Sequence, residues 1–333
     1  MPELCVIEGD GIGREVVPAA VRVLEEVIPA LEIVRAEAGW ECFQRRGVSV
    51  PPETLEAVRA CGAALFGAVS SPARKVVGYR SAILTMRQEL ELYANIRPVR
   101  SWPGISPRGD VDLIVVRENT EGLYSGRERQ NGDEAVAERV ITGHASRRIG
   151  RCALDLCEQL GRKRLTIVHK ANVLPLTDGL FRDSVRAVAA EYMARGAVVE
   201  VDELLVDIAT LKMISEPQRF DVVVTTNLFG DILSDAAAYW CGGMGYAPSI
   251  NLGEYTAVAE PVHGSAPDIA GRGTANPTAA ILSGALLARH VWGMEAVAAR
   301  IETAVEASLR DGQPGTTQGV LEAVLRGVNA ATI

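Results

Sequence analysis

The feature that most constrains the fold of this 333-residue chain is a regular alternation of short apolar runs with longer helical patterns. The apolar runs are rich in β-branched residues, which predicts strands. They lie at 4–7, 63–69, 111–117, 164–169, 198–201 and 221–226, and helical periodicity lies at 15–28, 52–60, 146–160, 178–194 and 293–309. Strands that alternate with helices predict an α/β fold with a largely parallel sheet.

Two segments rich in proline and glycine interrupt this alternation. They are RPVRSWPGISPRGD from Arg97 and GGMGYAPSINLGEY from Gly242. Because the chain is long enough for two domains, we expect it to cross between domains at these points. The predicted domains are a discontinuous one over 1–98 and 250–333 and an inserted one over 99–249. The polar stretch at 127–140 predicts a surface arm or hairpin.

Composition excludes several classes of function. Hydrophobic residues make up 48% of the chain, and the net charge of −8 provides no basic field for nucleic acid or anionic lipid. The six cysteines form no C-x-x-C pair, so we expect them to be reduced and mostly buried, as in a cytoplasmic protein. No export signal is visible at the N-terminus, and the most apolar stretch, 278–288, is too short to cross a bilayer.

The glycine-rich stretch LCVIEGDGIGREVVPA, at 4–19, has two interpretations. It joins a strand to a helix through glycines at 9, 11 and 13, as a dinucleotide-binding turn does. The third glycine of the G-x-G-x-x-G fingerprint is replaced by Arg14, although Glu37 lies where a ribose-binding carboxylate is required. The alternative is a tight turn with another purpose, and the missing glycine favours it.

Three carboxylates indicate a metal site. Asp231 and Asp235, in TTNLFGDILSDAAAYW, are four residues apart after a strand, so they share one helix face near the helix start. Asp207 follows another apolar run, in LLVDIAT. Such carboxylates suit Mg²⁺ or Mn²⁺, although two acids at a helix start are also ordinary partners of the helix dipole.

Three arginines, a tyrosine and a lysine have positions that suit a site for acids. Arg87 and Arg97 lie in MRQELELYANIRP, and Arg117 ends an apolar strand. Guanidinium forks bind carboxylates bidentately, which indicates a di- or tricarboxylic acid, although a single arginine is more often a surface residue. Tyr124 and Lys170 are candidates for proton transfer on a hydroxy acid. Their ordinary alternatives are a packing tyrosine and a surface lysine.

Six motifs, in this order and spacing, resemble the β-decarboxylating dehydrogenases, a family that includes isocitrate, isopropylmalate, homoisocitrate and tartrate dehydrogenases. The motifs are IEGDGIGREV, RQELELYANIRP, RENTEGLYSG, HKANVLPLTDGLF, TTNLFGDILSD and EPVHGSAPDIAGRGTANPTAAILS. The resemblance implies an isopropylmalate dehydrogenase-like fold, with two α/β domains and a non-Rossmann NAD site in the cleft between them. The large domain then binds the cofactor, and the small domain carries the metal site and the dimer interface.

The resemblance places the cofactor in the loop HGSAPDIAG and makes GDGIG a structural turn. Asp268 favours NAD over NADP, because a carboxylate accepts hydrogen bonds from a ribose diol and repels a 2′-phosphate. The residues implied in cofactor binding are His263, Gly264, Ser265, Ala266, Pro267, Asp268 and Asn276.

The same resemblance implies which residues hold the substrate and the metal. The arginines bind the carboxylates of a malate-like core, and the aspartates bind Mg²⁺ or Mn²⁺. The residues are Arg87, Arg97 and Arg117 for the substrate, and Asp231 and Asp235 for the metal, together with Asp207 from a second subunit.

The resemblance further implies catalytic roles. Lys170, from the partner subunit, helps to remove the hydroxyl proton, and Tyr124 protonates the carbon after CO₂ has left. Asn172 helps to orient the substrate or the nicotinamide. We therefore expect a homodimer with shared active sites, or a tetramer, in which the arm at 125–145 interlocks.

The segment SSPARKVVGYRSAILTMR is expected to select the substrate. Ser71 and Ser81 match substrate-binding positions of the family, and Arg80 or Ser81 is expected to read a distal carboxylate. Leu84 departs from the pattern, because one branch of homoisocitrate dehydrogenases has an arginine there. We expect homoisocitrate as the substrate, in lysine synthesis through aminoadipate, with isocitrate as a second substrate and 3-isopropylmalate third.

Two rival hypotheses belong to other classes. One is a non-catalytic regulatory subunit of the same family, and the presence of Tyr124, Lys170 and all three aspartates argues against it. The other is a Rossmann dehydrogenase without a metal, which sensitivity to a chelator would exclude.

Overall fold

The computed structural model describes residues 1–74, 76–312 and 314–330. They form two compact units. The first unit comprises 1–92, 101–109 and 241–333, and the second comprises 93–100 and 110–240. The chain therefore passes between the units at 93, 101, 110 and 241, where the sequence predicts single crossings near 99 and 250.

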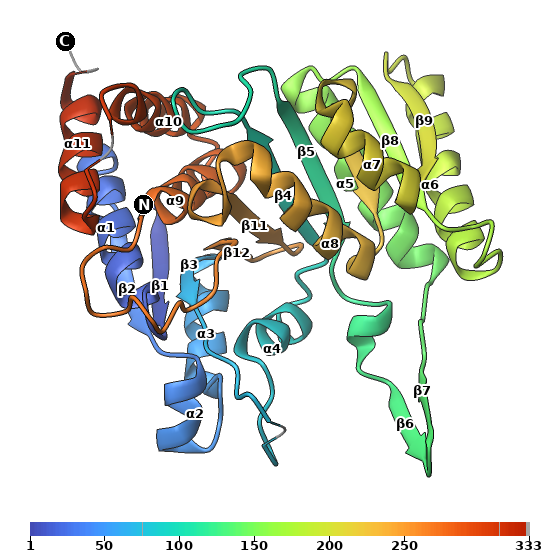
Figure 1. The fold of residues 1–333 in the computed structure, drawn as a ribbon, viewed down its shortest axis with the longest axis horizontal. Coiled ribbons are helices and arrows are strands. Elements are labelled where there is room, and N and C mark those ends of the chain that lie inside the picture. Colours follow the sequence, from blue (N-terminus) through green and yellow to red (C-terminus); the bar gives the residue numbers. More distant parts are fainter. Residues whose placement is uncertain (75, 313, 331–333) are drawn as a thin grey trace. The chain divides into compact units, whose positions relative to one another are not determined.

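The first unit is built on five strands in the order β2-β1-β3-β12-β11 (Figure 1). All neighbouring pairs are parallel except β11 and β12. The strands are β1 (Glu3–Gly9), β2 (Glu32–Ala36), β3 (Ala63–Ala68), β11 (Pro248–Leu252) and β12 (Ala257–Pro261). The helices are α1 (Gly13–Val27), α2 (Trp40–Arg46), α3 (Pro52–Cys61), α4 (Ala82–Glu89), α9 (Thr278–His290), α10 (Glu295–Arg310) and α11 (Thr317–Ala330).

The core of the first unit contains a helix that is apolar on all sides. Every residue of α9 from 278 to 288 is buried, and the helix packs on α1, α10 and the strands β11 and β12. Since a helix without a polar face has to be covered on all sides, α9 is a central core element. Within the described ranges, no helix is both long and apolar enough to span a membrane.

The second unit is built on five strands in the order β4-β5-β10-β8-β9. Only the pair β4 and β5 is antiparallel. The strands are β4 (Ala94–Arg100), β5 (Asp112–Glu118), β8 (Arg164–His169), β9 (Glu200–Leu205) and β10 (Val222–Thr225). The helices are α5 (Gly143–Leu160), α6 (Thr177–Ala194), α7 (Val206–Ser215) and α8 (Asn227–Ala237).

The register of the second unit brings three strand ends together. Thr225 of β10 pairs with Arg117 of β5 on one side and with Val168 of β8 on the other. These strands are buried on both faces, as is typical of parallel strands covered by helices. Residues at their carboxyl ends are therefore held at one edge of the sheet, where ligands bind in α/β folds.

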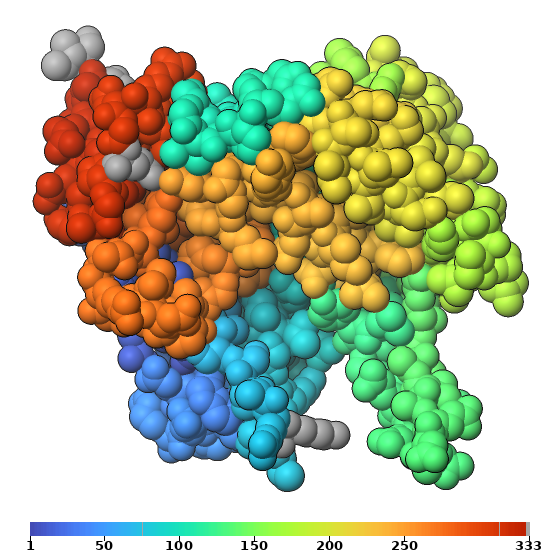
Figure 2. Space-filling model, in the orientation of Figure 1, coloured from blue at the N-terminus to red at the C-terminus, as the bar shows by residue number. Residues whose placement is uncertain are grey.

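A two-stranded hairpin extends from the second unit. It consists of β6 (Glu128–Asn131) and β7 (Glu134–Ala137), which pair antiparallel, and nearly all of its residues are exposed. Figure 2 shows it as a green arm that projects from the rest of the unit. The prediction of a hairpin at 127–140 is confirmed.

The structure confirms the α/β fold class and all six predicted strands, with one correction. The sheet is mixed, because β4 runs antiparallel to β5 and β11 runs antiparallel to β12. β11 lies inside the second segment that was interpreted as a domain crossing, and β4 runs into the first one with its residues 97–100. Pro98 lies within β4, yet Ile96 and Val99 are buried and the strand pairs with β5 along its whole length. Tertiary pairing thus overrides the local signal of the proline.

Candidate active site

Arg117 lies near the carboxyl end of β5 and is 1% exposed. Its Nε and Nη2 donate to Asn227 Oδ1 at 3.1 and 2.7 Å, and its Nη1 forms an ion pair with Asp231. Gly230 of α8 makes this approach feasible, since a Cβ there would lie only 2.6 Å from Arg117 Cγ. A buried arginine requires partners of this kind, and the surface-residue alternative is therefore wrong for Arg117.

Arg97, on β4, contacts the same helix. Its Nη1 donates to Asp235 Oδ1 at 2.6 Å and to Ser234 Oγ at 2.8 Å, and its Nη2 lies 3.5 Å from Asp231 Oδ1. Asn95 Oδ1 accepts a further hydrogen bond from Arg97 Nε at 2.8 Å. The two predicted arginines of this unit thus share one pair of carboxylates.

Asp231 and Asp235 do share one face of α8, as their spacing predicts. However, they lie in its second and third turns, and the first turn carries no acidic residue. The expectation that they lie near the helix start, and the helix-dipole alternative built on it, are therefore wrong. Two partly exposed carboxylates one turn apart fit a hard divalent cation as two of its oxygen ligands.

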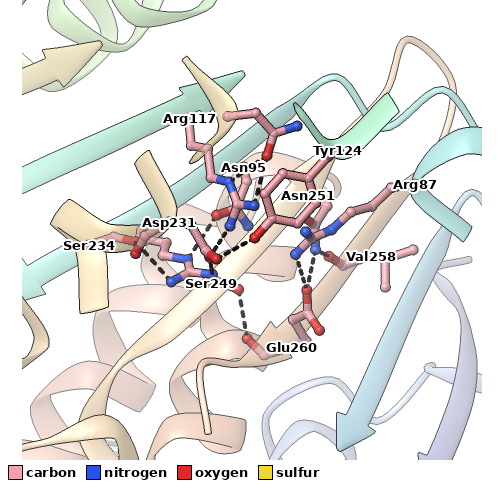
Figure 3. Close-up of polar contacts among 12 residues, drawn as sticks. Arg87, Asn95, Arg117, Tyr124, Asp231, Ser234, Ser249, Asn251, Val258 and Glu260 are labelled. Atoms are coloured by element: carbon pink, nitrogen blue, oxygen red, sulfur yellow. Dashed lines mark hydrogen bonds and ion pairs between the residues drawn. The ribbon is translucent and has the colours of Figure 1, made fainter. Parts of the chain in front are cut away.

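Tyr124 lies in a short 3-10 turn, Leu123–Ser125, and its hydroxyl points at the Asp231 carboxylate (Figure 3). Its hydroxyl donates to Asp231 Oδ2 at 2.5 Å, and the Arg117 guanidinium lies 4.9 Å from its ring centre. Burial and the bond to the Asp231 carboxylate raise the pKa of the Tyr124 phenol. The phenol therefore holds its proton at neutral pH, as a general acid requires.

Lys170 and Asp207 form a separate pair. Lys170 follows β8, Asp207 lies in the first turn of α7, and the two side chains form an ion pair. The hydrogen bond from Lys170 lowers the pKa of the Asp207 carboxyl. Asn172 is exposed in the turn after Lys170.

Asp207 does not join the aspartates of α8 in this chain. Among the residues with described positions, no group of three His, Cys, Asp or Glu side chains is arranged to hold a metal. A cation bound to Asp231 and Asp235 would therefore need further ligands from substrate, water or a second chain.

In the first unit, Arg87 lies on α4 and is buried. Its Nη2 pairs with Glu260 Oε1 at 3.1 Å, and Asn251 Nδ2 donates to the same oxygen at 2.9 Å (Figure 3). Arg87 Nε is buried without a hydrogen-bond partner. An unsatisfied buried donor is costly, so this nitrogen fits a missing anionic ligand. Glu260 precedes the HGSAPDIAG motif, and sequence reasoning assigned it no role.

The segment expected to select the substrate lines an open surface pocket of about 480 Å³. Ser71 lies at its edge, whereas Ser81 precedes α4 and its carbonyl accepts a hydrogen bond from Thr85. Arg80 donates to Gln88 Oε1 at 2.6 Å. The pocket is lined by Ser71, Pro72, Ala73, Arg74, Val76, Val77, Gly78 and Tyr79.

The turn GDGIG packs directly on the loop expected to bind the cofactor. Ile12 N donates to Ser265 O at 2.9 Å, and a Cβ on Gly11 would lie 2.2 Å from that oxygen. Asp10 accepts hydrogen bonds from the backbone of Trp40 and from Ser70, at 2.7 and 2.9 Å. The glycines therefore allow close packing, which agrees with the structural-turn interpretation.

The loop HGSAPDIAG leaves several groups available to a ligand. His263 Nε2 is buried without a hydrogen-bond partner, and burial lowers the pKa of the imidazole. Ala266 adopts a left-handed φ of 38°, and Asp268 is exposed. An unsatisfied ring nitrogen and an exposed carboxylate fit a nucleotide with a ribose diol.

The remaining residues expected to bind the cofactor differ in how far they are buried. Ser265 is buried, and its hydroxyl accepts a hydrogen bond from Ser70 at 2.8 Å. Gly264 and Pro267 are exposed in the loop, and Asn276 Oδ1 accepts from Thr278 N at 3.0 Å. Backbone and side-chain groups of this loop region are thus presented close together in the chain.

Glu37 is the carboxylate that a dinucleotide-binding turn at 4–19 would use to bind the ribose, and it is already occupied by other partners. Its carboxylate accepts hydrogen bonds from Arg45 at 2.5 Å and from Arg46 at 2.9 Å. The hydrogen bonds from Arg46 and Arg45 lower the pKa of the Glu37 carboxyl.

Comparison with known proteins identifies the class. The model of the family described as isocitrate/isopropylmalate dehydrogenase matches residues 3–329. The chain belongs to this family of decarboxylating dehydrogenases.

Individual relatives cover nearly the whole chain. The chain is 54% identical, over 98% of each sequence, to an isocitrate/homoisocitrate dehydrogenase of Thermus thermophilus. It is 47% identical to a 3-isopropylmalate dehydrogenase of Methanothermobacter thermautotrophicus, over 93% of this chain and 91% of that one. The crystal structure of isocitrate dehydrogenase from Methylococcus capsulatus has a TM-score of 0.92 and 42% identity, with 98% and 99% of the chains covered.

Proposed function

We propose that this protein catalyses the oxidative decarboxylation of homoisocitrate to 2-oxoadipate and CO₂, with NAD and Mg²⁺ or Mn²⁺, and that isocitrate is a second substrate. The observation that carries the proposal is the cluster of Arg97, Arg117, Tyr124, Asp231 and Asp235 on one face of the second unit. Buried guanidinium groups suit a substrate with several carboxylates. The family and the Thermus relative support this reaction class.

The chain's own residues supply substrate binding and proton transfer. Arg97 and Arg117 bind the malate-like carboxylates, and Tyr124 delivers its proton to the carbon that loses CO₂. Lys170 removes the hydroxyl proton. When bound, NAD would supply the hydride acceptor, and a divalent cation would supply a Lewis acid. Asp231 and Asp235 hold that cation, and Asp268 holds the ribose.

The proposed active site is shared between two copies of the chain. Lys170 and Asp207 pair with each other, whereas Tyr124, Asp231 and the arginines form a second set. We propose that, in a homodimer, the Lys170–Asp207 pair of one subunit and the Tyr124, Asp231 and arginine set of its partner together form one active site. The hairpin β6–β7 is proposed to interlock the two subunits. A cytoplasmic location agrees with six free cysteines, five of them buried.

A mixed-dimer experiment tests the shared site. We would co-express Tyr124→Phe and Lys170→Ala chains, each inactive alone, with different tags. Heterodimers then contain one intact site, so a random mixture recovers about a quarter of the wild-type activity. Sites built within one chain would give no recovery, and this outcome would contradict the shared arrangement.

The substrate is tested by kcat/KM for homoisocitrate, isocitrate and 3-isopropylmalate, with NAD and Mg²⁺, and with EDTA as the metal control. The highest value for homoisocitrate supports the proposal. A second candidate, 3-isopropylmalate, is favoured by one observation: Val76, Val77 and Tyr79 line the pocket of the selecting segment, and Leu84 lies on α4. A higher kcat/KM for 3-isopropylmalate than for homoisocitrate would overturn the homoisocitrate assignment.

A further inference from the structure

The turn that carries Lys170 is held through its backbone. Asp178 Oδ2, at the start of α6, accepts a hydrogen bond from Lys170 N at 2.6 Å. His169 Nδ1 accepts one from Ala171 N at 3.1 Å. Two successive N–H groups of the turn are thus bound by side chains, which fixes the point from which the Lys170 side chain extends.

Asp178 is a completely buried carboxylate, with 0% exposure. Its second oxygen, Oδ1, forms an ion pair with Arg139 Nη2 at 2.6 Å. Burial raises the pKa of Asp178, and the Arg139 charge opposes that shift. A buried carboxylate is retained in its ionised form only with such a partner, so the position of Asp178 depends on Arg139.

Arg139 follows the hairpin strand β7 and contacts more than Asp178. Its Nη2 donates to Thr226 Oγ1 at 2.9 Å, and its guanidinium lies 4.6 Å from the ring centre of Phe229. Thr226 immediately precedes α8, the helix of Asp231. Arg139 therefore connects the Lys170 turn to the start of the helix that carries the aspartates.

The next residue of this segment contacts the turn of Tyr124. Val140 O accepts a hydrogen bond from Gly122 N at 2.8 Å, and Gly122 precedes the 3-10 turn of Tyr124. Residues 139–140 thus bind the segments of both candidate proton-transfer groups. All these contacts lie within the second unit.

We propose that Asp178 is a positioning residue for Lys170 and that Arg139 holds Asp178 in place, which ties the Lys170 turn to the base of the hairpin β6–β7. The inference rests on the proposed function, because it concerns the placement of the proposed base. Neither residue reaches the reacting atoms. They act through the backbone of Lys170, since a small displacement of a reacting group is enough to slow a reaction strongly.

The test compares kcat, KM and melting temperature for four variants of the full chain. Asp178→Ala removes the acceptor, and Arg139→Ala leaves the carboxylate unpaired. Arg139→Ala combined with Asp178→Asn restores a neutral acceptor for Lys170 N–H. The control is Arg151→Ala, which removes an exposed pair with Glu191, 3.3 Å long, between α5 and α6 of the same unit.

We expect Asp178→Ala to lower kcat by roughly 10- to 100-fold with KM nearly unchanged, because the base is displaced while substrate binding persists. Arg139→Ala should lower kcat by about tenfold, and the double variant should recover to within about threefold of wild type. Arg151→Ala should retain wild-type kcat. If Asp178→Ala loses only thermal stability, or if the double variant stays as slow as Arg139→Ala, the proposal is wrong.

Amide hydrogen exchange in the peptide containing Lys170 and Ala171 gives a readout that requires no substrate. The Lys170 amide should be protected in the wild type and in the double variant, and should exchange much faster in Asp178→Ala. Unchanged protection would refute the positioning role. Failure of the wild type to turn over any of the three substrates would instead refute the proposed function, so the two failures are distinguishable.

Discussion

Two clusters of arginines and carboxylates in this protein have similar composition and opposite environments. The site cluster of the second unit contains Arg97, Arg117, Tyr124, Asp231 and Asp235. The α2 cluster of the first unit contains Glu37, Arg45, Arg46 and Glu53. In the site cluster, the side chains of Arg97 and Arg117 are 10% and 1% exposed. In the α2 cluster, those of Arg45 and Arg46 are 62% and 38% exposed.

The difference in solvent exposure distinguishes a candidate active site from an ordinary cluster of surface ion pairs. Ion pairs in water contribute little, because solvent screens them and the long side chains lose freedom on pairing. A buried guanidinium is costly to desolvate, so its retention requires a function or a complete set of partners. The α2 cluster is therefore expected to tolerate substitution, and the site cluster is not.

The largest effect is expected for Arg117→Ala in the site cluster. Loss of the buried Arg117 guanidinium should reduce kcat/KM for the preferred substrate by roughly 10²- to 10³-fold, because its charge-assisted contact with a substrate carboxylate is lost. Arg45→Ala in the α2 cluster is the matched control and should retain wild-type kcat/KM. Similar losses for both variants would remove the distinction between the clusters.

Tyr124→Phe removes one hydroxyl from the site cluster and leaves the ring. We expect kcat to fall by about 10²-fold, since the proton donor is lost, with the KM for the substrate nearly unchanged. Steady-state kinetics with folding checked by circular dichroism would measure this. An equal rise in KM would mean that the hydroxyl binds substrate and does not act as the acid.

The third prediction compares two single carboxylates of the first unit. Asp268→Asn should raise the KM for NAD by about tenfold, because a charge-assisted bond to the ribose weakens. Glu37→Gln should leave that KM unchanged, because its carboxylate is already bound by Arg45 and Arg46. The reverse pattern would place the cofactor at the GDGIG turn.

The smallest effect is expected for Arg46→Ala in the α2 cluster. Its melting temperature should change by no more than about 2 °C at pH 7, because the pairs are exposed. Since Arg46 and Arg45 lower the pKa of Glu37, their stabilisation is present above the usual carboxyl pKa and is lost as the pH falls through the folded value. Thermal scans at pH values falling stepwise from 7 should show the difference shrink once the Glu37 carboxyl is protonated, whereas a difference that does not change with pH would show that packing, not charge, is responsible.

The sequence predicts strands and helices well where burial and periodicity agree. The runs that became β5, β8 and β10 have mostly apolar centres and are buried almost throughout, so one pattern predicts both the strand and its burial. Prediction from the sequence fails for β4 and β11, because proline and glycine in their segments indicate a local break. Whether these residues pair with a neighbouring strand depends on residues far away in the chain. Local propensity carries no information about that partner.

For the site, the sequence by itself determined the residue types and the family motifs, including Tyr124, Asp231 and the arginines. The tertiary structure decided which of them are buried together, that Glu37 is already paired, and that Glu260 and Asp178 support Arg87 and Lys170. The physical reason is that exposure and partner choice arise from contacts between distant segments. A carboxylate in the sequence looks the same whether it is solvated, paired or buried, and only the fold distinguishes these states.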